Sequence, residues 1–123
     1  MAILEGIKGL EAIVHVSGRG ISKEFVDREE TTPRRASNYI EAVTGAEFSV
    51  NYRFTSHFES KELAFAINVY IDGKYMNGHL LDSYTATSGD YTNCFFGTRD
   101  ENQGQWQSRK FAFSKLVIRM YFL

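Results

Sequence analysis

The chain has 123 residues and a formal net charge of −1, with 43% hydrophobic and 24% charged side chains. This length and composition are typical of one globular domain, which we expect to span residues 1–123. The near-zero charge provides no basic surface for nucleic acid or for acidic lipid, so neither partner is expected. No uncharged apolar stretch is long enough to cross a membrane.

The first residues, MAILEGIKGLEAIVHV, do not resemble a secretory signal. Glu5, Lys8 and Glu11 interrupt the apolar run that such a signal needs. Cys94 is the single cysteine, so no intrachain disulfide can form. These observations favour an intracellular protein, either cytoplasmic or nuclear.

The first strand is predicted at residues 10–17, LEAIVHVS, with His15 on its solvent side. Residues 18–38 form the main irregular stretch. Ile21, Phe25 and Val26 are expected to anchor its first half as an edge strand, and a surface excursion is expected to follow.

The segment SNYIEAVTG, residues 37–45, supports two interpretations. Asn38 as N-cap, Glu41 three residues later and Gly45 as a stop indicate a helix of about two turns. The aromatic and β-branched residues of 39–43 instead indicate a strand. The pattern leaves both open.

Two strands with clear period-two alternation follow. In AEFSVNYRF, the residues Phe48, Val50, Tyr52 and Phe54 share one face, opposite Glu47, Ser49, Asn51 and Arg53. In LAFAINVYI, the odd positions from Leu63 to Ile71 share an apolar face, opposite Ala64, Ala66, Asn68 and Tyr70. Each strand therefore buries one side only.

Asp72-Gly73 between two such runs predicts a two-residue β-hairpin turn. Asn77-Gly78 is predicted as the next corner. Further strands are expected at 79–84, 91–97, 105–113 and 116–123. The pattern predicts an all-β, antiparallel, jelly-roll-like β-sandwich of about eight strands with at most one short helix.

No arrangement of reactive residues predicts an enzyme. The histidines 15, 57 and 79 lack metal-ligand spacing, and Cys94 beside two phenylalanines reads as a small buried hydrophobic residue. Nucleophile-elbow, phosphate-loop and dinucleotide motifs are missing. We therefore expect neither catalysis, nor a metal, nor a cofactor.

A ligand site, if the chain has one, is predicted where the hairpin meets the loop at residues 98–105. Its candidate residues are Tyr75, Asn77, Arg99 and Trp106. Trp106 has two interpretations: it plugs one end of the core, or it is an exposed platform for a sugar ring or a peptide.

The final segment, LVIRMYFL, is apolar on both faces. Such a strand lies centrally in a sheet, or a partner covers it, because an exposed apolar edge invites pairing with another chain. The residues predicted for self-association are Leu116, Ile118, Arg119, Met120, Tyr121 and Phe122.

Three segments resemble a fungal domain family of unknown function: YIEAVTGAEFSVNYRF, VYIDGKYMNG, and Trp106 followed by RKFAFSKL. EGIKGLEAIVHVSG is similar to the family's opening strand. The resemblance implies an intracellular β-sandwich with no assigned catalytic residue. Relatives often continue into charged tails typical of nuclear proteins, whereas this sequence ends at LVIRMYFL.

The function predicted from these features is that of a non-catalytic intracellular interaction module, which binds a protein partner or a second copy of itself. The alternative is a lectin-like sandwich that binds carbohydrate through Trp106 and Tyr75.

Overall fold

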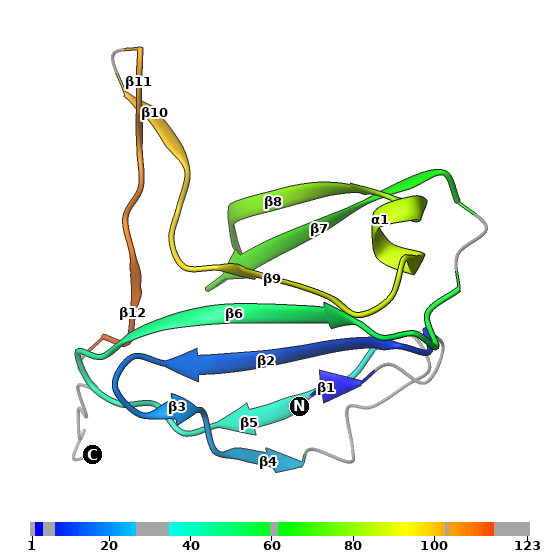
Figure 1. Cartoon of the computed structure of the whole chain (residues 1–123). Coiled ribbons are helices and arrows are strands. Elements are labelled where there is room, and N and C mark those ends of the chain that lie inside the picture. The colour runs from blue at the N-terminus through cyan, green and yellow to red at the C-terminus, as the bar shows by residue number, and fades with distance from the viewer. Residues whose placement is uncertain (1, 4–6, 27–34, 60–61, 103, 115–123) are drawn as a thin grey trace, which may run out of the picture.

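The computed structural model describes residues 2–3, 7–26, 35–59, 62–102 and 104–114. Its centre is an antiparallel sheet in the order β1-β2-β6-β12, with β3 added to β2 and β9 added to β6 (Figure 1). These strands are β1 (Ala2–Ile3), β2 (Leu10–Val16), β3 (Gly20–Ile21), β6 (Glu47–Phe54), β9 (Tyr91–Phe95) and β12 (Phe111–Ala112). We call this the main sheet.

The second layer is a hairpin of β7 (Ala64–Ile71) and β8 (Lys74–Asp82). Its turn is Asp72-Gly73, with φ angles of 52° and 76°. The positive φ values are those of a two-residue hairpin turn, so the predicted turn is confirmed.

The core lies between the main sheet and this hairpin. Tyr52, Phe54 and Phe95 of the main sheet are 3%, 1% and 1% exposed, and Val69 and Leu81 of the hairpin are buried with them. The predicted alternation of β6 and β7 explains the arrangement, because each strand sends every second side chain into the core. The all-β, antiparallel, sandwich-like fold is confirmed.

The prediction of a corner at Asn77-Gly78 is wrong. Both residues lie inside β8, where Asn77 is paired with Val69 and Gly78 with Asn68. A Cβ atom on Gly78 would lie 2.5 Å from Asn68 Oδ1 and 2.7 Å from Tyr75 OH. Glycine is therefore used here for close side-chain approach and not for a turn.

The helix suggested at residues 38–44 does not form. Asn38–Ile40 is strand β5, paired with β4 (Glu24–Val26). The single helix of the described residues is α1 (Ser83–Thr87), which begins where the predicted strand 79–84 was expected to continue. Asp82 caps it by accepting a hydrogen bond of 2.7 Å from the Thr85 backbone N–H, which also lowers the pKa of Asp82.

The apolar residues expected to anchor residues 21–26 are instead exposed. Ile21 is 68%, Phe25 49% and Val26 71% accessible to solvent. Ile21 lies in β3, a two-residue strand at the edge of the main sheet, whereas Phe25 and Val26 lie in β4, which forms a separate two-stranded sheet with β5.

The predicted strand 105–113 is divided into two strands. β11 (Gln105–Gln107) pairs with β10 (Asp100–Asn102) in a hairpin that projects away from the sheets, and β12 returns to the main sheet (Figure 1). The surface excursion expected at residues 27–34 and the strand expected at 116–123 lie outside the described residues.

Candidate functional site

The outward side of the β7–β8 hairpin is the first exposed surface of interest. Four cross-strand pairs point away from the core, and we call them the hairpin face: Ala64–Asp82, Ala66–Leu80, Asn68–Gly78 and Tyr70–Tyr75. Asp82 is the one charged residue among these eight, and its carboxylate already caps α1. The face is thus a flat, nearly uncharged surface.

Aromatic and aliphatic side chains on this face are unusually accessible. Leu80 is 86% exposed, Tyr70 63% and Tyr75 58%. The two tyrosine rings meet edge to face, with centroids 5.7 Å apart, so they hold one another in place. The Tyr75 hydroxyl extends along β8 to cover Gly78. Leu63 and Tyr84, at 87% and 81% exposure, lie next to the hairpin in sequence.

A second exposed site lies on the outer side of the main sheet, where β6 changes its partner. β6 pairs with β9 from Phe54 to Val50 and with β12 at Phe48 and Glu47. Ser49 lies at the junction between these two partners. Between Phe95 and Lys110 the chain leaves the sheet to form the β10–β11 hairpin, and a hollow of about 330 Å³ remains at the junction.

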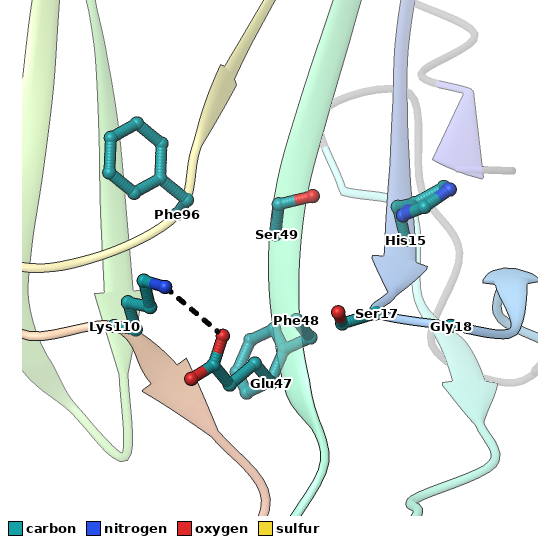
Figure 2. A pocket seen from close by; sticks show the side chains of 8 residues that line it. All are labelled: His15, Ser17, Gly18, Glu47, Phe48, Ser49, Phe96 and Lys110. Carbon is teal, nitrogen blue, oxygen red and sulfur yellow. Dashed lines mark ion pairs between the residues drawn. The ribbon is translucent and has the colours of Figure 1, made fainter.

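We call this hollow the polar groove. Figure 2 shows Ser49 between His15 of β2 and Phe96 at the end of β9, with Glu47, Lys110 and Ser17 also in the lining. The Lys110 ammonium lies 3.6 Å from a Glu47 carboxylate oxygen. Phe96 is 58% exposed, because its neighbour Phe95 fills the core position on the other side of the strand.

Hydrogen bonds and a close backbone approach hold the lining of the groove in place. The Asn51 side-chain amide donates to Ser49 Oγ at 3.1 Å. Gly97 brings the returning chain close, since a Cβ atom there would lie 2.5 Å from the Arg109 carbonyl oxygen. The Thr98 backbone N–H donates to that same oxygen at 2.8 Å. These backbone contacts of Gly97 and Thr98 with Arg109 therefore determine the position of the next residue, Lys110.

A polar pair lies between the two layers, formed by the buried Tyr52 and the half-buried His79. Tyr52 OH and His79 Nδ1 are 2.7 Å apart, and the imidazole stacks on Phe95 with centroids 4.1 Å apart. Burial raises the pKa of Tyr52, with a further contribution from Tyr91, and burial lowers the pKa of His79. The phenol therefore keeps its proton and the charged form of the imidazole is disfavoured, while the tautomer of His79 decides which of the two groups donates the hydrogen bond.

Of the four predicted ligand residues, Tyr75 does not line the same hollow as Asn77 and Arg99. Asn77 and Arg99 line one hollow of about 330 Å³, whereas Tyr75 lines a neighbouring hollow of about 480 Å³. Asn77 uses both polar atoms inside the protein: Nδ2 donates to the Gly97 carbonyl at 3.2 Å, and Oδ1 accepts from the Gly78 N–H. The described part of Trp106 is its backbone in β11, opposite Glu101.

The sequence did not predict the polar groove as a site, although it placed several of the lining residues on solvent faces. Alternation already placed Glu47 and Ser49 on the solvent face of β6, and His15 on that of β2. No local signal could place Phe96 and Lys110 beside them, because those positions depend on which strands pair with β6.

Among the described residues, no three histidine, cysteine, aspartate or glutamate side chains are grouped in a way that could hold a metal ion. The same part of the chain contains no helix with the length and apolar character of a membrane span. Cys94 is half-buried in β9 and pairs with Asn51, so the prediction of a buried hydrophobic residue at this position is not confirmed.

The fold and its two exposed surfaces define a small, two-layer antiparallel β domain. In the comparison with protein families, residues 9–120 match the model of the Domain of unknown function (DUF7918), and the chain belongs to that family. The resemblance to a family of unknown function is confirmed to that extent. No curated protein and no solved structure matches the chain.

Proposed function

We propose that this domain is a non-catalytic interaction module that binds a second copy of itself through the hairpin face. The observation that carries the proposal is the exposure of Tyr70, Tyr75 and Leu80 on a sheet surface that has one charged residue in eight. Contiguous apolar surface of this kind marks interaction sites in soluble proteins.

A second copy is the partner that this surface suits best. In a two-fold dimer the same patch meets itself, so any charge on the patch faces a like charge. The hairpin face avoids that repulsion because it is nearly uncharged. Tyrosine also combines a large apolar area with a polar tip, which is why it is enriched at interfaces.

The test is sedimentation velocity of the full chain across a concentration series. We expect wild-type protein to show a concentration-dependent dimer. Leu80→Glu places a carboxylate at the centre of the face, and in a two-fold dimer it places two, so the dimer should weaken at least tenfold, or about 1.4 kcal/mol. Ile21→Glu is the matched control, because Ile21 is also a highly exposed aliphatic residue, at 68%, but lies on β3.

Two outcomes contradict the proposal. A wild-type protein that stays monomeric at the highest soluble concentration rules out self-association. Loss of the dimer in Arg119→Glu, with Leu80→Glu unaffected, assigns self-association to the final segment, residues 116–123, as the sequence predicted.

Carbohydrate binding through Tyr75, Asn77, Arg99 and Trp106 has weaker geometric support. The side chain of Asn77 is occupied by Gly97 and Gly78, and Tyr75 and Arg99 line separate hollows. Titration with sugars while monitoring Trp106 fluorescence tests this version directly.

A further inference from the structure

We propose that the polar groove on the outer side of the main sheet binds a neutral saccharide. The groove is independent of the hairpin face, since it lies on the opposite side of the main sheet. It combines one exposed aromatic ring, Phe96, with hydroxyl, carboxylate and ammonium groups from three other strands or their ends. An apolar wall with a few convergent polar groups is the general form of a small-molecule site.

The aromatic ring matches one part of a sugar. A pyranose has a face made of C–H groups and a rim of hydroxyls. Phe96 is 58% exposed and belongs to neither the core nor the hairpin face, so its ring is free to cover such a C–H face. The volume of about 330 Å³ is at the small end for ligand sites and suits one or two sugar rings.

The polar groups of the groove match the hydroxyl rim of a sugar. Each sugar hydroxyl both donates and accepts, and the groove offers both functions: Glu47 accepts, Lys110 donates, and Ser17 and Ser49 do either. Hydrogen bonds to the two charged groups are the stronger kind. Ser49 is pre-oriented by the Asn51 amide, which lowers the cost of fixing it on binding.

The charges favour a neutral ligand over an ionic one. Glu47 and Lys110 lie 3.6 Å apart and balance each other. A phosphate or carboxylate bound to Lys110 would be repelled by Glu47, and a cation bound to Glu47 would be repelled by Lys110. Neutral hydroxyls can bridge the pair without this penalty.

The strand pairing disfavours a peptide. A peptide that binds a sheet usually adds to a free strand edge. β2 occupies one edge of β6, and on the other edge Ser49 alone lies between the residues paired with β9 and those paired with β12, which is too short a gap for a strand. A ligand in the groove must therefore use side chains, as a sugar does.

The experiment uses the isotope-labelled full chain and four soluble neutral sugars as probes: glucose, galactose, mannose and N-acetylglucosamine. Amide shifts are followed to high millimolar concentration, and affinity is then measured for the best probe. We expect shifts at residues 15–17, 47–49, 96 and 110. Phe96→Ala should weaken binding at least tenfold and Glu47→Gln severalfold, whereas Phe25→Ala, an exposed aromatic on β4, should bind normally.

Three results would overturn the proposal. The first is that none of the four sugars shifts the groove amides. The second is that binding persists in Phe96→Ala but is lost in Tyr75→Ala or Trp106→Ala, which places the site at the hairpin. The third is that a glycan array shows binding to sulfated or carboxylated glycans alone and that Lys110→Met abolishes it. Leu80→Glu leaves the groove intact, so dimerisation and sugar binding are tested separately.

Discussion

The hairpin face and the outer face of the main sheet lie on opposite sides of one core, and they differ in charge. On the main sheet, Arg53 pairs with Asp90 at 3.1 Å and with Glu11 at 4.0 Å, and Lys110 pairs with Glu47. On the hairpin face, tyrosine, leucine, alanine, glycine and asparagine take seven of the eight positions, and Asp82 takes the eighth.

The difference shows that alternation alone does not determine what an exposed face is for. Both faces follow the same period of two, and both leave every second residue in solvent. Solvent exposure favours charged side chains, which the main sheet has at several exposed positions and the hairpin face has at Asp82 alone. The hairpin face therefore suits contact with another surface, and the main-sheet face suits a small polar ligand.

The largest expected effect is a loss of stability when the Phe95 side chain is removed from between the two layers. This residue is 1% exposed and contacts Tyr52 of the main sheet and His79 of the hairpin. Phe95→Ala should lower the free energy of unfolding by about 3–5 kcal/mol, because it leaves a cavity in the shared core. Phe96→Ala is the adjacent control and should change it by less than about 0.5 kcal/mol. If urea unfolding shows equal losses of unfolding free energy in the two variants, the placement of Phe95 in the core and Phe96 in solvent is wrong.

A smaller effect is expected where the chain passes close to itself. Gly97→Ala would place Cβ against the Arg109 backbone, which cannot move without disturbing β12, so a loss of about 1–3 kcal/mol is expected. In Gly78→Ala the nearest atoms are the side-chain ends of Asn68 and Tyr75, and the loss should stay below about 1 kcal/mol. Thermal unfolding of the two variants ranks their losses of stability. A larger loss in Gly78→Ala would show that the backbone between β9 and β12 can move to accept a side chain at residue 97.

The Tyr52–His79 pair that joins the two layers predicts a pH dependence of stability. Burial lowers the pKa of His79 below 6.5, its value in the unfolded chain. The unfolded state therefore binds a proton more readily, and this contribution to stability is fully present above pH 6.5 and is lost as the pH falls through the lower folded-state pKa. Urea unfolding at pH 7.5 and pH 5 should show the loss.

Two variants test whether His79 causes this dependence. His79→Asn should reduce the difference in stability between pH 7.5 and pH 5. His15→Asn, which changes an exposed histidine of the polar groove, should leave the difference unchanged. A wild-type difference that survives in His79→Asn would assign the pH dependence to other groups.

The smallest effect is expected on the charged outer face. Arg53 is 47% exposed, so its ion pairs with Asp90 and Glu11 are weakened by water and salt. Arg53→Gln should lower the free energy of unfolding by less than about 1 kcal/mol, and this difference should shrink further in 1 M salt. A loss above about 2 kcal/mol would mean that these charges support the fold and are not merely a solvated surface.

Residue order alone determined the fold class and much of each strand. The alternation of residues 47–54 and 64–71 predicted which side chains enter the core, since a strand turns each successive side chain to the opposite face. Asp72-Gly73 predicted the hairpin turn because few residue pairs accept two positive φ angles.

Tertiary structure decided the features that depend on which segments of the chain pair with or cover one another. Asn38–Ile40 became a strand because β4 lies beside it, although its flanking residues would also suit a helix. Gly78 entered a strand because Tyr75 and Asn68 cover it. The polar groove arose where β6 exchanges β9 for β12, which brings Phe96 and Lys110 to Ser49. Local sequence does not encode that exchange, because strand pairing is a contact between residues that are far apart in the chain.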